Sequence, residues 1–137
     1  MNIIGNGVDI VDNKRIEKLI INNDFLRRIF TKNEIKISKS RKNKINFFAK
    51  RFAAKEAFVK ALGTGFRDNI NFSDIEIIND TNGKPKLKIS HKIKQLIQKK
   101  FKTKKTNIYV SLSDEKKHSI AYVILENLSW KNLLLKI

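Results

Sequence analysis

Residues 51–60 read RFAAKEAFVK, a mostly apolar stretch within the longest helical pattern of the chain. The pattern runs over residues 43–62, and Gly63 follows it as a typical C-terminal stop. An apolar helix of this length has to be buried in a small protein, so this stretch decides the fold. Glu56 and Lys60 are charges inside it that need an explanation.

The helix has two predicted faces. The core face is formed by Phe48, Phe52, Val59 and Leu62, with Phe58 beside them. The neighbouring face carries Ala49, Ala53, Glu56 and Lys60. The small alanines predict a groove beside Glu56, where the carboxylate holds a cation or a polar ligand. The alternative is a solvated ion pair between Glu56 and Lys60, which have the favourable acid-first spacing but would add little stability.

A second carboxylate, Asp9, stands in an unusual place. It lies between Val8 and Ile10 in the segment GVDIVD, which otherwise has the apolar character of a β-strand. A half-buried carboxylate needs a partner, and a Mg²⁺ ion held by Asp9 and Glu56 would serve both acids. From the residues alone, Asp9 could instead pair with a lysine or cap a turn, although Asp12 is the better capping candidate.

Composition limits the possible functions. The 137 residues are enough for one domain, residues 1–137, and a hydrophobic content of 41% permits a real core. Without cysteine there are no disulfides and no thiol chemistry, and two histidines are too few for a typical imidazole-built zinc site. Any metal is therefore expected to be a hard cation held by oxygen. No signal peptide or membrane span is recognisable, which predicts a cytoplasmic protein without a membrane partner.

The net charge of +17 favours an anionic partner. A compositional bias toward Lys, Asn, Ile and Phe is an alternative source of the surplus. A small nucleic-acid-binding protein is the rival interpretation of the charge. The chain has no recognition-helix, zinc or aromatic RNA-binding signature, so we predict no nucleic-acid partner.

The remaining patterns predict an α+β fold, with helices packed against a mainly antiparallel sheet. Strands are expected over residues 3–11, 73–78, 86–89, 107–113 and 119–126. Helices are expected over about 12–21 and 24–30, after the capping box formed by Thr31 and Glu34, over 43–62, and after Ser90. The apolar tail, 130–137, is expected to pack on something, such as a neighbouring subunit.

Two segments, GVDIVDNKRI at 7–16 and FAAKEAFVKALG at 52–63, resemble the two signatures of the 4′-phosphopantetheinyl transferases in order and spacing. Three shorter segments, FTKNE, FSDIEI and NGKPKL, resemble the small bacterial holo-[acyl-carrier-protein] synthase type. The resemblance covers Gly5 to about Glu126. It implies a 4′-phosphopantetheinyl transferase-like fold and a homotrimer with active sites between subunits.

The resemblance also implies a reaction. Such enzymes transfer 4′-phosphopantetheine from coenzyme A to a serine of acyl carrier protein, depend on Mg²⁺, release adenosine 3′,5′-bisphosphate and serve fatty acid biosynthesis. By motif, Asp9 and Glu56 match the catalytic Mg²⁺ ligands, and Lys60 matches the catalytic lysine beside the phosphates. Contacts with coenzyme A are implied for Arg51, Lys60, Gly63, Gly65 and Pro85.

A basic surface near the first signature is the predicted binding site for the acidic carrier protein. Arg15 matches the family's carrier contact, and the surface continues through Lys18, Arg27 and Arg28. For these three residues an ordinary solvated face is the stronger alternative. Two departures from the family pattern are visible. The segment LIINND at 19–24 lacks the basic residues that often follow Arg15, and Asp114 stands where the family often has histidine.

Overall fold

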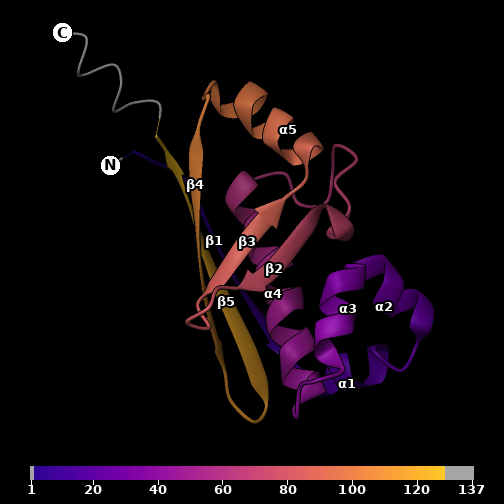
Figure 1. The fold of residues 1–137 in the computed structure, drawn as a ribbon. Coiled ribbons are helices and arrows are strands. Elements are labelled where there is room, and N and C mark those ends of the chain that lie inside the picture. The colour runs from indigo at the N-terminus through magenta and orange to yellow at the C-terminus, as the bar shows by residue number, and fades with distance from the viewer. Residues whose placement is uncertain (1, 129–137) are drawn as a thin grey trace, which may run out of the picture.

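The structure, a computed structural model, describes residues 2–128 (Figure 1). In chain order the elements are β1 (Ile3–Asp12), α1 (Asn13–Leu19), α2 (Asn23–Ile29), α3 (Lys32–Ser38), α4 (Lys44–Leu62), the 3₁₀ turn η1 (Phe72–Asp74), β2 (Ile75–Asn79), β3 (Pro85–Ile89), α5 (His91–Phe101), β4 (Thr106–Asp114) and β5 (His118–Asn127). Every predicted helix and strand is found, with its ends shifted by no more than about two residues, as is usual for element boundaries. The turn η1 lies where the sequence predicted the start of a strand.

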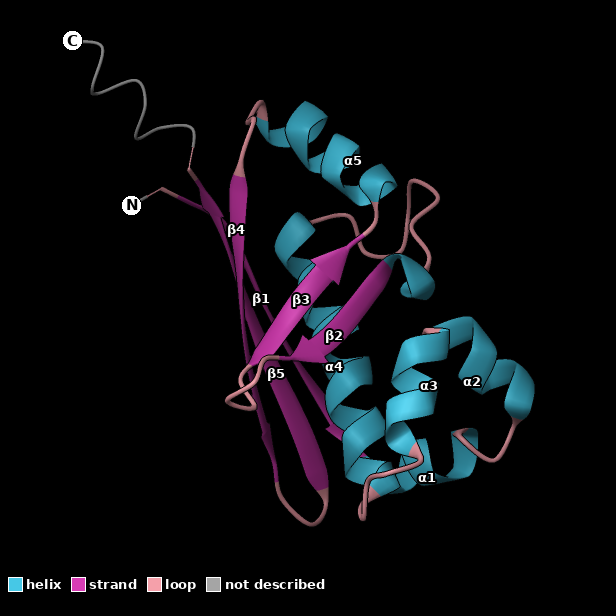
Figure 2. Ribbon diagram, in the orientation of Figure 1, coloured by secondary structure: helices cyan, strands magenta, loops and turns pink. Residues whose placement is uncertain are grey.

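The strands form two antiparallel sheets. One has the order β1-β5-β4, and the other pairs β2 with β3. Figure 2 shows the long three-stranded sheet along α4, the helices α1, α2 and α3 gathered at one end, and α5 at the other end. The predicted α+β class is confirmed, and the division into two sheets is the main difference from the expected single sheet.

Helix α4 is the central element of the fold. The Asn43 side chain caps its N-terminus, and Gly63 ends it in the left-handed conformation with φ of 76°. Strands β1 and β5 pack along it, and α1, α3 and β2 contact it elsewhere. Ala49 and Ala53 therefore have no exposed surface. The prediction of a single core face beside an open alanine groove is wrong, because a central helix is covered on nearly all sides.

Two glycines allow β1 to approach α4 closely. A Cβ on Gly7 would collide with the carbonyl oxygen of Ala57, and a Cβ on Gly5 would collide with that of Ala61. Strand backbone thus lies directly against helix backbone. Asp9 is two residues beyond Gly7 and on the same face of the strand, so this contact brings its side chain to the surface of α4.

Local capping explains the short helices. Asp12 caps α1, Asn22 caps α2, and Thr31 with Glu34 forms the predicted capping box of α3. The prediction that Asp12 is the capping acid is confirmed, so Asp9 has a different partner.

Within residues 2–128, no helix combines the length and the apolar character of a membrane span. The tail at 130–137, for which packing against a neighbour was expected, lies outside the described residues.

Candidate active site

Asp9 on β1 and Lys60 on α4 form the first contact of the candidate site. The Lys60 ammonium donates to Asp9 Oδ1 and to the Val8 carbonyl, both at 3.0 Å. The Lys60 side chain is 53% exposed and that of Asp9 only 15%. The alternative in which Asp9 pairs with a lysine is therefore realised. Among the described residues, the salt-bridge partner of Lys60 is Asp9 rather than Glu56.

Glu56 lies one turn before Lys60 on α4 and is half-buried. Burial raises the pKa of the Glu56 carboxyl, and the negative charge of Asp9 raises it further, while Lys60 and Arg15 act in the opposite direction. The structure thus brings the two acids predicted from distant motifs within electrostatic reach of each other. A partly desolvated pair of carboxylates is a place where additional positive charge is favourable.

The donor set suits a hard divalent cation. Asp9 and Glu56 offer oxygen atoms only, and Mg²⁺ commonly takes one or two carboxylates together with water and substrate phosphate. Within residues 2–128, no group of three or more His, Cys, Asp or Glu side chains could hold a metal. The residues present fit an ion that shares its coordination with a substrate rather than one enclosed by protein ligands.

The raised pKa of Glu56 predicts a cost in stability. A carboxyl with a raised pKa binds its proton more tightly in the folded state, so stability is lost as the pH rises from below the unfolded pKa through the folded pKa. At pH 7 the ionised group therefore destabilises the metal-free protein. We expect Glu56→Gln to raise the melting temperature at pH 7 by on the order of 1–3 °C.

Thermal unfolding followed by circular dichroism in EDTA tests this prediction. The advantage of Glu56→Gln should shrink at acidic pH, where the wild-type carboxyl becomes protonated as well. Glu17→Gln on α1, which changes an exposed acid, is the matched control and should leave the melting temperature unchanged. A variant less stable than the wild type at pH 7 would show that the carboxylate is held by favourable contacts instead.

The predicted carrier-binding residues lie on α1 and α2. The Arg15 guanidinium lies 5.9 Å from the centroid of the Phe52 ring on α4, and its charge lowers the pKa of Glu56. Arg15 is therefore close to the acid pair. The other three residues are exposed on the same two helices: Lys18, Arg27 and Arg28.

A separate cavity of about 310 Å³ collects two of the predicted coenzyme A residues, Arg51 and Pro85. Its lining includes the further basic residues Arg41, Lys42 and Lys50. Asp114 also lines the cavity, where it pairs with Lys50 at 3.3 Å and accepts a hydrogen bond from Asn46 Nδ2 at 2.7 Å. The Asp114 carboxylate is thus engaged with the basic wall of this cavity.

Arg51 is 3% exposed and held on several sides. Its guanidinium carbon lies 3.6 Å from the centroid of the Phe47 ring, and Nη2 donates to Asn79 Oδ1 at 2.9 Å. Its Nε is 4.0 Å from Glu34 Oε2 and has no hydrogen-bond partner among the described residues. Burial lowers the pKa of Arg51 to about 10, and Glu34 opposes that shift. The side chain borders the cavity and is also part of the core.

The predicted coenzyme A residues fall on two sides of α4. Arg51 and Lys60 are nine positions apart, which corresponds to about 13 Å along the helix and about 180° around it. The two side chains therefore leave α4 on opposite sides.

Gly63 and Gly65 form the end of α4. Both have positive φ, 76° and 60°. The Gly63 N–H donates to the Lys60 carbonyl and the Gly65 N–H to the Val59 carbonyl. Both N–H groups are thus used within the chain, as expected for the helix stop predicted at Gly63. Contact between these glycines and coenzyme A stays a prediction.

A buried ion pair next to the site was missed from the sequence. Glu34 and Lys55 have no exposed surface, and Lys55 Nζ lies 2.6 Å from Glu34 Oε1. In the sequence, Lys55 stands out only as a charge inside an apolar helix, and Glu34 only as a capping residue. The useful signal was that a lysine buried on a core helix requires an acid, and Glu34 was a candidate.

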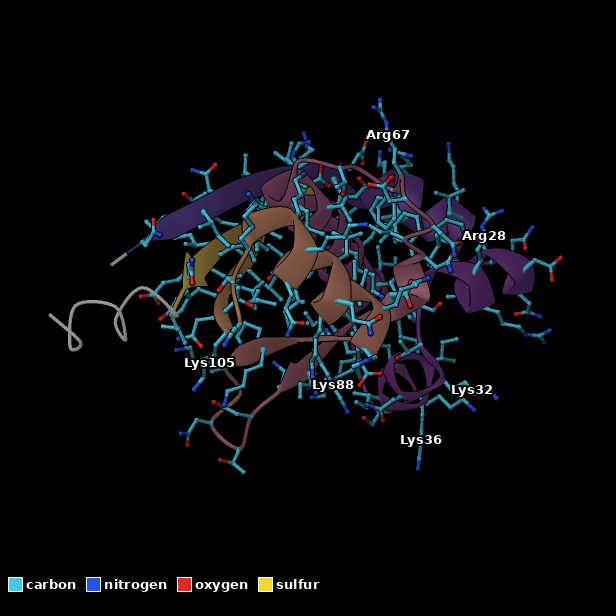
Figure 3. The ribbon with its side chains drawn as sticks, turned by 90° about the horizontal axis from the view of Figure 1, so that it is seen from above. Arg28, Lys32, Lys36, Arg67, Lys88 and Lys105 are labelled. Carbon is cyan, nitrogen blue, oxygen red and sulfur yellow. The ribbon has the colours of Figure 1, made fainter. Side chains whose placement is uncertain are left out.

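Basic side chains are spread around the molecule. The labelled residues in Figure 3 project from different sides of it: Arg28, Lys32, Lys36, Arg67, Lys88 and Lys105. These six do not form a single stripe, so the large net charge does not by itself mark one binding face.

Comparison with known proteins identifies a family whose matched region contains the residues of the candidate site. A model of the 4′-phosphopantetheinyl transferase superfamily matches residues 5–123, which include both acids and Lys60. The holo-[acyl-carrier-protein] synthase of Pelagibacter ubique (strain HTCC1062) is 54% identical over 126 residues, covering 92% of this chain and 98% of the relative.

Among solved structures, similar folds are found in holo-[acyl-carrier-protein] synthases. The holo-[acyl-carrier-protein] synthase from Neisseria meningitidis has a TM-score of 0.82 at 36% identity, over 91% of this chain and 99% of that chain. The one from Bacillus anthracis str. Ames, in complex with CoA (3′,5′-ADP), has a TM-score of 0.77 at 38% identity, over 93% and 99%.

Proposed function

Because the chain belongs to the 4′-phosphopantetheinyl transferase superfamily, we propose that it transfers 4′-phosphopantetheine from coenzyme A to a serine of apo acyl carrier protein, with Mg²⁺, for fatty acid biosynthesis. The predicted family and transferase class are confirmed by the matches. The observation that carries the proposal within the chain is the meeting of Asp9, Glu56 and Lys60 at the contact of β1 with α4.

The reaction is a displacement at phosphorus. The serine oxygen forms a bond to the phosphorus that carries pantetheine, and the bond from that phosphorus to the bridging oxygen breaks. Adenosine 3′,5′-bisphosphate leaves with the bonding electrons, and the serine proton has to be accepted. Such a reaction depends mainly on positioning and on neutralising the charge that develops.

We assign each site residue one task in this chemistry. Lys60, anchored by Asp9 and the Val8 carbonyl, stabilises the negative charge on the leaving oxygen. Asp9 and Glu56 would hold Mg²⁺, which when bound neutralises the diphosphate of coenzyme A. Glu56 also orients a water molecule that accepts the serine proton.

The outer face of the three-stranded sheet is the surface that we assign to assembly into a homotrimer. Its large apolar side chains are between 39% and 64% exposed: Val8, Ile10, Tyr109, Ile120 and Tyr122. Cross-strand pairing of Val8 with Tyr122 and of Ile10 with Ile120 makes them contiguous. Contiguous exposed apolar surface of this kind marks interfaces. We assign this face to further copies of the chain, so that the cavity with Arg51 and Pro85 on one subunit complements the acid pair of its neighbour.

We propose that residues 1–137 form one domain. The cytoplasmic location remains a prediction from the sequence.

Arg15 is assigned to carrier binding because it lies beside the acid pair on an exposed helix. We expect Arg15→Ala to raise the KM for acyl carrier protein about 10-fold at low salt, with kcat nearly unchanged, and the effect to shrink as salt screens the attraction. Initial rates against carrier concentration at about 50 mM and about 500 mM salt measure this. Arg67→Ala, which removes an exposed arginine from the loop after α4, is the control. An Arg15→Ala defect that is equal at both salt concentrations would contradict steering.

The direct test of the function is the mass of the carrier. Apo acyl carrier protein incubated with the protein, coenzyme A and Mg²⁺ should gain the mass of one phosphopantetheine group on its serine. The gain should disappear in EDTA and return with excess Mg²⁺. A folded protein that modifies no apo carrier under these conditions would contradict the proposal.

A further inference from the structure

The buried Glu34–Lys55 pair has no task in the proposed chemistry. Neither side chain has exposed surface, so neither can touch a substrate. Lys55 nevertheless directly precedes Glu56 along α4. The pair therefore lies behind the site, on the interior side of the same helix.

Lys55 connects α4 to three other segments. Its ammonium donates to Glu34 Oε1 in α3 at 2.6 Å, to the carbonyl of Ile29 at the end of α2 at 2.7 Å, and to the carbonyl of Phe72 in η1 at 3.3 Å. An ammonium group has three N–H bonds, and all three are used. The position of residue 55 is therefore fixed from three directions.

Glu34 is held just as completely. Its Oε1 accepts from the Thr31 N–H at 2.9 Å as well as from Lys55, and its Oε2 accepts from the Ile77 N–H in β2 at 3.1 Å. The carboxylate thus joins the start of α3, strand β2 and helix α4. Local capping alone would need neither the contact with β2 nor the lysine.

Stability is not a sufficient explanation for this arrangement. Removing two charges from water is costly, and well-packed apolar residues of similar volume are often as stabilising as a buried ion pair. What such a pair supplies better than apolar packing is one defined geometry, because its hydrogen bonds are directional.

The geometry points to Glu34 and Lys55 as positioning residues that hold α4 in the rotation at which Glu56 lies beside Asp9. Successive helix residues are separated by about 100° and about 1.5 Å, so fixing residue 55 also fixes residue 56. The inference rests on the proposed function, since it takes Glu56 as a metal ligand.

The test replaces the pair by neutral side chains of similar size, Glu34→Gln with Lys55→Met. We expect a cooperatively folded protein whose affinity for Mn²⁺, measured by electron paramagnetic resonance with coenzyme A present, falls about 10-fold, as for other residues that orient metal ligands. We expect kcat to fall by a similar factor and the KM for the carrier to stay within about 2-fold. In the metal-free variant, amide hydrogen exchange over residues 53–58 should accelerate.

Lys92→Met is the matched control. Lys92 also pairs with an acid, Asp74 at 2.8 Å, and donates to a carbonyl, that of Asn69 at 2.6 Å, but it lies on α5. Its removal should leave the Mn²⁺ affinity unchanged.

Unchanged Mn²⁺ affinity and kcat in a folded double variant would overturn the inference. If the double variant does not fold, the test uses Glu34→Asp, which keeps the charge and shortens the side chain. We expect this variant to lose at least about 3-fold in Mn²⁺ affinity, and an unchanged affinity would overturn the inference. The variant Glu56→Ala distinguishes a failure of the metal assignment from a failure of the positioning role alone. If it keeps Mn²⁺ binding, the metal assignment fails and the positioning role with it. If it loses Mn²⁺ binding while the double variant keeps it, only the positioning role fails.

Discussion

Glu56→Ala is expected to lower kcat/KM for phosphopantetheine transfer by at least about 1,000-fold without unfolding the protein. The variant removes one of two carboxylates that the account assigns to Mg²⁺, and it also removes the group that orients the proton-accepting water. The side chain is only half-buried, so its loss should leave the core intact. Rates are measured by the mass shift of apo acyl carrier protein, and folding by circular dichroism.

Two comparisons make this result specific. Glu115→Ala removes an acid from the exposed hairpin between β4 and β5 and should retain the wild-type rate. Asp9→Ala should show a loss similar to that of Glu56→Ala, since the two acids act on the same ion. If Glu56→Ala or Asp9→Ala kept full activity, the assignment of a shared metal site would be wrong.

Tyr122→Arg is expected to produce a monomer that has lost at least about 100-fold in kcat. Tyr122 lies on β5, is 43% exposed, and is paired with Val8 in the middle of the apolar sheet face. A guanidinium at this point would have to be desolvated in the assembly without a partner, which is strongly unfavourable. If the active site is built from two subunits, the loss of assembly also separates the Arg51 cavity from the acid pair.

Sedimentation velocity and the carrier assay, carried out on the same sample, test this prediction. Ile21→Arg is the control for assembly, because Ile21 is 81% exposed but lies between α1 and α2, away from the sheet. A Tyr122→Arg protein that is monomeric and fully active would show that one subunit contains the whole site. A wild-type protein that is monomeric and active would contradict the assembly as well.

Much of the fold could be predicted because its signals are local. Asp12, Thr31 with Glu34, and Ser90 mark helix starts, and Gly63 marks a helix end, each through contacts within a few residues. The alternating strands of the last hairpin have a local pattern of the same kind.

The features that were not predicted depend on contacts between distant residues. The sequence pattern of β2 and β3 does not indicate that they form a separate two-stranded sheet. The burial of α4 on nearly all sides depends on the elements that surround it. The contact between Gly7 and Ala57 depends on how closely the backbone of β1 approaches that of α4. The Glu34–Lys55 pair requires α3 to lie beside α4. Helical periodicity cannot supply these facts.

For the site, the sequence identified Asp9 and Glu56 as acids in need of a shared partner, and the structure brings them into electrostatic contact. It left open that Asp9 pairs with a lysine but did not identify Lys60 as that lysine, because spacing along α4 favoured Glu56 as the partner of Lys60. Spacing on one helix identifies possible neighbours, and the approach of β1 decides between them.

The most direct measurement of the central claim is electron–nuclear double resonance on Mn²⁺ bound together with coenzyme A. The account predicts one Mn²⁺ per active site, coupled to the phosphorus of the diphosphate, with binding lost in Glu56→Ala and in Asp9→Ala. If both variants bind Mn²⁺ with the wild-type affinity and the same phosphorus coupling, these two carboxylates do not hold the ion, and the account is contradicted.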